Sequence, residues 1–291
     1  MNILLTGATG FVGSFFIKAY TQKYNIQNFS FLKDNIQELE LTNIDTVIHL
    51  SALVHQMGGA SREEYNTVNV VQTLKLAQKA KENGVTHFIF MSTVKVYGEE
   101  TDTPYNEYSE CNPQDEYGKS KLKAEQALQK LEDKHFKVST IRTPIVYGYG
   151  VKANIKNLIN LVKKVPILPF ADIKNRRSMV YVGNLCYLVD VLIEKRVKFN
   201  ISQSIFLASD IEPLSTTKLI TLIAKTLNRK IYLIKIPFFE MLLKFIRPSF
   251  HKRLYESLEV DNRRTKEILN LYNLYTIEES MRQMLISEIE F

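Results

Sequence analysis

The chain has 291 residues, long enough for one large domain or for a domain with a smaller lobe. Its hydrophobic fraction of 45% and charged fraction of 24% are ordinary for a globular protein, and two cysteines exclude a disulfide framework or a cysteine-ligated zinc site. The net charge of +7 comes from lysines and arginines spread along the chain. We therefore expect a basic surface and a phosphate-bearing small ligand, and no nucleic acid.

Neither export nor a membrane span is predicted. The N-terminus leads directly into a predicted strand, without the charged and apolar regions of a signal peptide. No apolar run reaches the roughly 18 residues of a membrane-spanning helix. The five scattered histidines form no metal-binding pattern. We therefore expect a cytoplasmic protein with no membrane insertion and no metal.

The first two thirds of the chain alternate short apolar runs with helical patterns, which is typical of a parallel sheet covered by helices on both faces. The predicted strands are residues 2–6, 28–32, 46–50, 87–91, 137–142 and 204–207. The predicted helices are residues 13–24, 62–83, 115–135, 154–164 and 216–228. The prediction is an α/β fold: a Rossmann-like, doubly wound parallel sheet with a smaller C-terminal substrate-binding lobe. Residues 1–150 and the returning segment 179–207 would build the first part, and residues 151–178 and 208–291 the lobe.

A glycine-rich turn joins the first predicted strand to the first predicted helix. Gly7, Gly10 and Gly13 stand where the backbone must turn tightly and approach a pyrophosphate with no Cβ in the way. The free amides at the helix start then face the anion. An ordinary strand-to-helix turn is the alternative, but the strand–loop–helix context favours a dinucleotide site.

A dinucleotide site also needs an acidic residue that binds the adenosine ribose, about 20 residues further along. Asp34 lies 21 residues after Gly13 and is the candidate. Lys33 beside it would instead meet a 2′-phosphate. The predicted cofactor is therefore NAD or NADP.

Tyr117 and Lys121 form the candidate proton-transfer pair. They lie four residues apart at the start of a predicted helix, so the ammonium can lie under the phenol. A free phenol, with a pKa of about 10, exchanges protons poorly at neutral pH, and a nearby ammonium and a nicotinamide cation would lower that pKa. Ser92 or Thr93, at the end of a predicted strand, would hold the reacting sugar oxygen. Alone, the pair is close to a chance pattern, and a surface tyrosine and lysine is the alternative.

Together these motifs resemble the extended short-chain dehydrogenases/reductases, the family of NAD-dependent epimerases and dehydratases. The matching stretches are residues 6–13, 47–52 (VIHLSA), 88–98 (FIFMSTVKVYG), 117–121 and 142–148 (RTPIVYG). The resemblance implies pyrophosphate contacts from Phe11 and Val12, and a nicotinamide ribose contact from Lys121. It favours Thr93 over Ser92 as the catalytic hydroxyl. It also implies a cofactor-binding set made of Ser51, Ala52, Leu53 and Pro144.

The sequence departs from the family pattern in two places. Family members that eliminate water carry an Asp-Glu pair after the catalytic hydroxyl, where this chain has Val94 and Lys95, which argues against a 4,6-dehydratase. The stretch between Tyr24 and Thr46 is also short. Either a strand is lost there, or the strand predicted at residues 28–32 is the third one and the second is missing. In the latter case Asp34 would bind adenine instead of ribose.

The substrate side is predicted from two later segments. Paired arginines before a β-rich run suit a diphosphate, because guanidinium groups bind its oxygens in pairs. The resemblance assigns Asn154 and Arg177 to the diphosphate of a nucleotide sugar, with Arg176 as a weaker candidate. Residues 236–253 are apolar and basic enough to lie on a membrane, but we expect a helix of the lobe there.

The sequence therefore predicts an NAD(P)-dependent enzyme acting at C4 of a UDP-hexose or UDP-N-acetylhexosamine derivative. It is either a 4-epimerase or a 4-keto-sugar reductase, and the resemblance places it in surface polysaccharide synthesis. A non-catalytic dinucleotide-binding regulator of the same fold is the alternative. Family resemblance further implies a homodimer that pairs the helices at residues 62–83 and 115–135.

Overall fold

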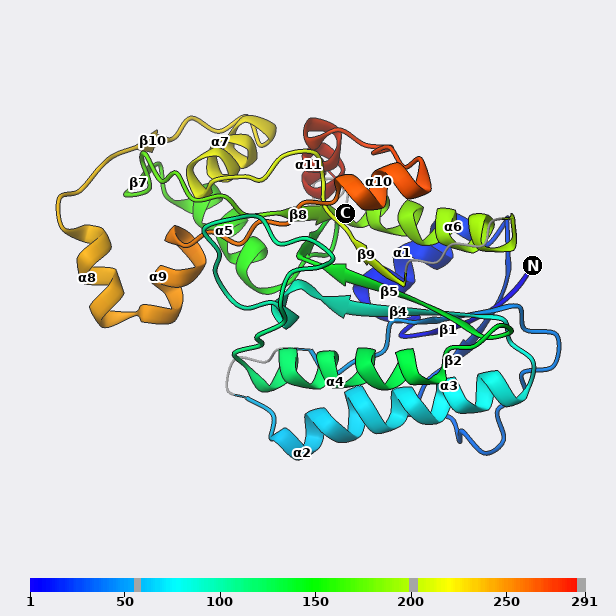
Figure 1. The fold of residues 1–291 in the computed structure, drawn as a ribbon. Helices are drawn as coiled ribbons and strands as arrows, with labels where there is room; N and C mark the ends of the chain where they lie inside the picture. The colour runs from blue at the N-terminus through cyan, green and yellow to red at the C-terminus, as the bar shows by residue number, and fades with distance from the viewer. Residues whose placement is uncertain (55–58, 199–203, 287–291) are drawn as a thin grey trace.

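The computed structural model describes residues 1–54, 59–198 and 204–286 (Figure 1), so His55 lies outside the described residues. Its centre is a sheet of six parallel strands in the order β2-β1-β3-β4-β5-β9. These strands are β1 (Asn2–Thr6), β2 (Asn25–Phe29), β3 (Thr46–His49), β4 (His87–Thr93), β5 (Lys137–Thr143) and β9 (Ile205–Leu207). The predicted parallel sheet is confirmed.

Helices cover both faces of this sheet, because neighbouring residues of each strand point to opposite sides and both sides are buried. On β1, Ile3 and Leu5 pack on one side with α1 (Phe11–Tyr20) and α6 (Val182–Lys198), and Leu4 packs on the other with α3 (Thr73–Glu82) and α4 (Glu116–Leu131). Helix α6 was not predicted from the sequence, since its long apolar run hides the helical period.

Strand β2 begins three residues before the predicted strand. It pairs with β1 along its length, with Thr6 opposite Phe29, and the chain then turns because the amides of Lys33 and Asp34 both donate to the Ser30 carbonyl. Residues 30–45, all of them described, form no further strand or helix. Strand β2 therefore occupies the position of the second strand, next to β1. The missing strand is the third one, which would follow it.

The helix predicted at residues 62–83 is interrupted in its middle. It consists of α2 (Arg62–Tyr65), a π-helical segment η1 (Asn66–Gln72) and α3. Ser61 caps its start, since its hydroxyl accepts from the Glu64 amide while the Glu64 carboxylate accepts from the Ser61 amide. The wider π turn matters because it carries Asn69, a buried asparagine, into the interior.

The rest of the chain forms the C-terminal lobe, beyond the carboxyl ends of the strands (Figure 1). Two small parallel pairs join distant segments, β6 (Ile145–Tyr147) with β8 (Met179–Tyr181) and β7 (Ile167–Leu168) with β10 (Tyr232–Leu233). The helices are α5 (Ala153–Lys164), α7 (Thr216–Thr226), α8 (Phe239–Ile246), α9 (Pro248–Tyr255), α10 (Arg263–Leu269) and α11 (Ile277–Ile286). The lobe is thus present, while the domain limits given above stay a prediction.

Candidate active site

The turn between β1 and α1 leaves no room for side chains. A Cβ added at Gly13 would lie 2.2 Å from the Gly7 carbonyl oxygen, and one added at Gly7 would lie 2.9 Å from the Ser51 amide nitrogen. Gly7 also has a φ of +74°, in the left-handed region. Helix α1 starts at a glycine cap without a side-chain hydrogen bond or an acidic residue in its first turn. Its first amides therefore suit an anion such as a dinucleotide pyrophosphate.

A buried polar chain connects this turn to the end of β3. The Ser51 amide donates to Thr6 Oγ1 (3.1 Å), and Thr6 Oγ1 lies 2.7 Å from His49 Nδ1. His49 Nε2 lies 2.9 Å from Thr73 Oγ1, whose own proton is donated to the Asn69 carbonyl. Thr73 therefore accepts from Nε2–H, and Thr6 Oγ1 donates to Nδ1 when the imidazole is neutral. Burial agrees with this arrangement, since it lowers the pKa of His49 to about 3.

Asn69 fixes the loop that follows β3. Its side-chain oxygen accepts from the Leu53 amide (2.8 Å), while its Nδ2 donates to the Leu53 carbonyl (3.0 Å) and to Ser120 Oγ (2.9 Å). One asparagine thus clamps the predicted cofactor-lining residues to helix α4. Sequence reasoning missed Asn69, although a polar residue on the buried side of a helical pattern was a usable signal.

Asp34 lies beyond the end of β2 but its side chain turns back toward that end. Its Oδ2 accepts from the Ser30 amide (2.7 Å), and the side chain is exposed. A carboxylate therefore stands at the edge of the sheet where a ribose hydroxyl is expected, although the strand ends three residues earlier than the sequence predicts. The ribose contact of Asp34 stays a prediction.

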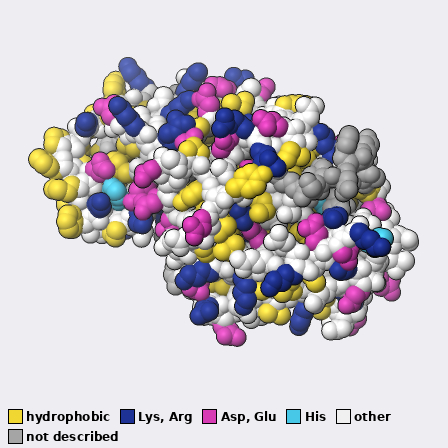
Figure 2. Space-filling view, viewed as in Figure 1, with side chains coloured by type: hydrophobic (Ala, Val, Ile, Leu, Met, Phe, Trp, Pro, Cys, Tyr) yellow, Lys and Arg dark blue, Asp and Glu magenta, His cyan; other side chains and the backbone are white. Residues whose placement is uncertain are grey.

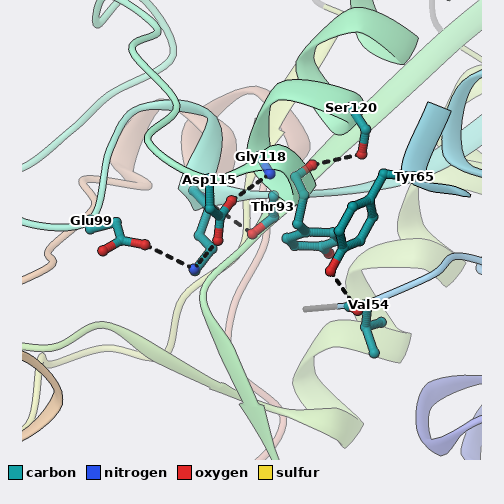
Figure 3. Close-up of polar contacts among 9 residues, drawn as sticks. Val54, Tyr65, Thr93, Glu99, Asp115, Gly118 and Ser120 are labelled. Carbon is teal, nitrogen blue, oxygen red and sulfur yellow. Dashed lines mark hydrogen bonds and ion pairs between the residues drawn. The ribbon is translucent and has the colours of Figure 1, made fainter. Parts of the chain in front are cut away.

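Tyr117 lies in the first turn of α4, next to the carboxyl end of β4. Asp115 caps this helix, with Oδ1 accepting from the Gly118 amide (2.7 Å), and the Tyr65 ring lies 6.2 Å from the Tyr117 ring between centroids. Thr93 lies near the Tyr117 hydroxyl and lowers the pKa of the phenol. Figure 3 shows Thr93, Asp115 and Tyr65 gathered around this helix start. The structure therefore places a strand-end hydroxyl near the phenol, and the catalytic pairing of the two stays a prediction.

The pKa of Tyr117 is shifted in the direction opposite to the expected one. Burial raises it above the ordinary value, the charge of Asp115 raises it further, and only the nearby Thr93 hydroxyl lowers it. The side chains of the protein alone keep the phenol protonated. The prediction that a neighbouring ammonium would lower this pKa is wrong for the chain by itself, because burial and the charge of Asp115 both raise it.

Lys121 is fully buried, and its ammonium does not contribute to the Tyr117 shift. Its Nζ lies 4.2 Å from the centroid of the Phe90 ring, in a cation–π contact, and burial lowers its pKa to about 7 despite the opposing effect of Glu125. The helix thus places Lys121 one turn after Tyr117, as the spacing predicts, but the Lys121 Nζ lies against the sheet.

Ser92 and Thr93 have different partners. Ser92 donates to Glu125, which also accepts three hydrogen bonds from Arg142, and the Arg142 Nη2 to Glu125 Oε2 distance is 2.6 Å. The Arg142 guanidinium stacks 4.6 Å above the Tyr97 ring. Ser92 therefore belongs to a buried ion-pair cluster, whereas Thr93 faces Tyr117. Glu125 was missed in the sequence, although its place four residues after Lys121 puts it on the same buried helix face.

At the two positions where dehydratases carry acids, this chain builds something else. Val94 is buried, and Lys95 Nζ lies 2.5 Å from Asp115 and 3.2 Å from Glu99. Both residues belong to the short helix η2 (Val94–Val96), which Thr93 caps through the Lys95 amide. Because Val94 is apolar and Lys95 is ion-paired, these two positions offer neither an acid nor a free base.

A cavity of about 320 Å³ lies within the lobe, among α5, α7, α9 and the strand pair of β6 and β8. Asn154 and Arg177 both line it, together with Arg253 of α9, whose Nη1 donates to Asn154 Oδ1 (3.1 Å). Arg177 donates to the Glu256 carbonyl (3.0 Å), and burial lowers its pKa. Arg176 is instead turned outward and paired with Glu259 at 2.6 Å. The structure thus brings Asn154 and Arg177 together, adds Arg253, and leaves Arg176 out of the cavity lining.

Residues 3–202 match the NAD dependent epimerase/dehydratase family. The chain belongs to this family. The UDP-glucose 4-epimerase of Vibrio cholerae is 34% identical over 310 residues, covering 97% of this chain and 94% of that protein. The N-acetyl-alpha-D-glucosaminyl-diphospho-ditrans,octacis-undecaprenol 4-epimerase of Escherichia coli O157:H7 is 28% identical and covers 81% of this chain and 76% of that protein.

Other relatives are named as dehydratases. The dTDP-D-glucose 4,6-dehydratase of Mus musculus is 30% identical, over 50% of this chain and 51% of that protein. Among solved structures, the UDP-glucuronic acid 4-epimerase from Bacillus cereus in complex with NAD has a TM-score of 0.80 at 20% identity, over the full length of both chains. At that identity the likeness concerns the fold, and it confirms the Rossmann-like architecture.

Family membership confirms the resemblance given by the motifs and the dependence on a nicotinamide dinucleotide. The glycine turn and the uncapped start of α1 fit such a cofactor, since both leave backbone amides open to a pyrophosphate. The roles of individual cofactor and substrate residues stay predictions. Among the residues that the structure describes, no group of His, Cys, Asp or Glu could hold a metal ion.

Proposed function

We propose that this chain is a UDP-sugar 4-epimerase that uses NAD. The observation that carries the proposal is the placement of Tyr117, at the start of α4, beside Thr93 at the carboxyl end of β4, the edge of the sheet that also bears the glycine turn. In open parallel sheets, ligands bind at this edge. The 4-epimerase relatives that match nearly the whole chain support the reaction type.

In this mechanism Tyr117 moves the proton of the sugar O4 hydroxyl. Thr93 donates a hydrogen bond to O4 and holds it within reach of the phenol oxygen, while Lys121 binds the nicotinamide ribose. The cofactor, when bound, accepts the hydride of C4 and returns it, and its positive ring favours the phenolate that the buried site otherwise disfavours. Tyr117 then returns the proton to O4 once the sugar has presented its opposite face.

The other proposed roles follow the same placement. Gly7, Gly10, Phe11, Val12 and Gly13 bind the pyrophosphate, Asp34 the adenosine ribose, and Ser51, Ala52, Leu53 and Pro144 the rest of the cofactor. On the substrate side, Asn154 and Arg177 bind the sugar diphosphate, and Arg253 joins them because it lines the same cavity and bonds to Asn154.

A 4,6-dehydratase is not proposed, although dehydratases are among the relatives. Elimination of water needs an acid and a base beside the catalytic hydroxyl. Here Val94 is buried and Lys95 is bound to Asp115 and Glu99, so neither residue supplies them. The chain's own chemistry therefore supports hydride transfer at one carbon.

Product analysis separates the remaining possibilities. The purified protein is incubated with NAD and, in turn, with UDP-glucose, UDP-N-acetylglucosamine and UDP-glucuronic acid, and the products are resolved by chromatography. We expect C4 epimers from at least one of them, without added reductant. Reduction of a UDP-4-keto sugar with consumption of NADH or NADPH, and no epimers, would make the chain a 4-keto reductase instead. Binding of NAD without turnover of any of these sugars would support a regulator.

We also propose a homodimer, cytoplasmic location and a role in surface polysaccharide synthesis, all on family resemblance. The dimer would use α3 and α4, which lie side by side on one face of the sheet (Figure 1). Sedimentation equilibrium of the full chain tests it, and a mass independent of concentration and equal to 33.7 kDa would contradict it.

A further inference from the structure

Helix α8 is apolar but does not belong to the core. Of its eight residues, all described, none is buried. Only Phe239 and Leu243, one turn apart, are half-buried against the lobe, and Phe239 packs on Phe170. The opposite side exposes a row of large apolar side chains at helical spacing, made of Phe238, Met241, Leu242, Phe245 and Ile246. We call these five residues the α8 face.

The side chains of the α8 face are highly exposed for large apolar residues. Phe245 is 83% exposed and Phe238 is 78% exposed. Nearby, Ile234, Ile236 and Phe250 are exposed as well. Figure 2 shows hydrophobic side chains gathered at the end of the molecule where Figure 1 places α8. Contiguous apolar patches of this kind mark a surface that another body covers.

In the segment that carries the α8 face, residues 234–253, basic side chains outnumber acidic ones. Between residues 234 and 253 the only acidic side chain is Glu240. Five basic side chains accompany it, namely Lys235, Lys244, Arg247, Lys252 and Arg253. Lys244 and Arg247 are exposed and flank the apolar row directly. An apolar row bordered by basic residues is complementary to a bilayer that exposes anionic head groups above an apolar interior.

We propose that α8 and the start of α9 form a docking surface for an anionic lipid bilayer. The five residues of the α8 face enter the boundary between head groups and acyl chains, and Lys244 and Arg247 contact lipid phosphates. A second copy of the chain fits less well, because an isologous contact through this surface would place two clusters of like charge opposite each other. No helix among the described residues is long and apolar enough to cross a membrane, so the contact is one of adsorption.

Docking in this way would bring the substrate cavity close to the lipid surface. Phe250, Arg253 and Leu254 of α9 line that cavity, while Pro248 directly follows the turn that joins α9 to α8. The docking surface and the cavity wall are therefore parts of one short helical hairpin. The proposal concerns the surface alone and does not depend on which sugar is turned over.

Vesicle binding tests the proposal on the full chain. The protein is sedimented with vesicles of phosphatidylglycerol and phosphatidylethanolamine in equal parts, and with vesicles of phosphatidylcholine alone. We expect binding to the first and about tenfold weaker binding to the second, and weaker binding to the first as salt is raised. Equal binding to both vesicles, or binding to neither, would overturn the proposal.

Three double variants identify the surface. Leu242→Ser with Phe245→Ser removes apolar contact, and Lys244→Glu with Arg247→Glu reverses the charge; we expect each to weaken binding to anionic vesicles about tenfold or more. The matched control is Leu32→Ser with Ile211→Ser, which removes two exposed apolar side chains elsewhere. Circular dichroism melting shows that each variant is folded.

The same variants also test whether a second copy of the chain, and not a bilayer, covers the α8 face. If the α8 face joined two copies, Leu242→Ser with Phe245→Ser would lower the mass in sedimentation equilibrium and leave vesicle binding unchanged. Either that result, or a control pair that weakens binding as much as the α8 pair, would contradict docking to lipid.

Discussion

Two regions of this protein invert the usual distribution of polarity. Beneath α4 the interior is polar, since His49, Asn69, Glu125 and Arg142 are all buried there. At α8 the surface is apolar, with Phe245 among the most exposed side chains. Polar groups in a core cost free energy unless they are paired, and apolar groups on a surface invite another body to cover them. Each of these two regions therefore indicates a function beyond the stability of the fold.

The buried polar region serves the catalytic face of the sheet. Asn69 holds the loop after β3 by hydrogen bonds. Glu125 accepts the hydrogen bond of the Ser92 hydroxyl, so Thr93 is the one of the two hydroxyls that lies near Tyr117. Every partner in this region comes from another element of the structure. The exposed α8 face has no comparable internal partners, which is why its occupant has to be sought outside the chain.

The largest expected effect is on catalysis. Tyr117→Phe keeps the ring and removes the oxygen that moves the proton, so we expect kcat to fall by about two to four orders of magnitude, with NAD affinity retained. The matched control is Tyr65→Phe, since the Tyr65 ring packs against Tyr117 and its hydroxyl makes only a long bond to the Val54 carbonyl (3.4 Å). Epimer formation followed by chromatography measures both. Equal turnover in wild type and Tyr117→Phe would refute the mechanism.

The second prediction concerns the buried ion pair. Glu125→Ala leaves the Arg142 guanidinium buried without its carboxylate, so the free energy of unfolding should fall by about 3–5 kcal/mol. Glu212→Ala is the control, because Glu212 pairs with Lys218 on the surface, where solvent screens the pair and the loss should be much smaller. Urea unfolding of the two variants measures the difference. Similar losses for both would show that the polar interior contributes no more than a surface pair.

The third prediction uses the lowered pKa of Lys121. Burial lowers it to about 7, and unfolding restores the ordinary value of 10.5. Between these two pH values the unfolded chain binds more protons than the folded chain, so stability rises with pH, by at most about 1.4 kcal/mol per unit. Below about pH 7 both states carry the proton and the dependence disappears. Urea unfolding at pH 7, 8 and 9 without added NAD measures the slope.

Lys121→Met is the control for this slope. Methionine fills a similar volume and carries no proton, so the rise in stability between pH 7 and 9 should be smaller in the variant than in the wild type. Glu125 is the nearby charge that opposes the shift, and His49 stays neutral throughout this window because its pKa is about 3. If wild type and variant have the same slope, Lys121 is not the group responsible.

The sequence predicted those features that rest on short-range geometry. The glycine turn, the helix with Tyr117 and Lys121 on one face, and Thr93 at the strand end all follow from local spacing, and the structure has them in these elements. Strand β2 was placed three residues late because Phe29, Phe31 and Leu32 look like one strand. Only the structure shows that the chain turns at Ser30 and leaves Leu32 exposed.

The features that were missed depend on contacts between distant segments. Arg253 meets Asn154 across 99 residues, and Glu125 meets Arg142 from another element. The direction of the Tyr117 pKa shift was also missed, because it depends on how much water the folded chain removes and not on which charge stands four residues away. The exposure of α8 belongs here too, since a helix of the lobe was expected in that segment and its lack of buried residues became visible only in the fold.

The smallest expected effect is on the stability contributed by the α8 face. Phe245 is 83% exposed, so Phe245→Ser removes little buried area and should change the free energy of unfolding by less than about 0.5 kcal/mol. Phe239→Ser, six residues earlier on the same helix, removes a ring that packs against Phe170 and the lobe, and should cost about 1–3 kcal/mol. Urea unfolding of both variants without lipid makes the comparison. A loss at Phe245 as large as that at Phe239 would mean that the exposed row stabilises the chain itself, and it would remove the reason to assign that row to a bilayer.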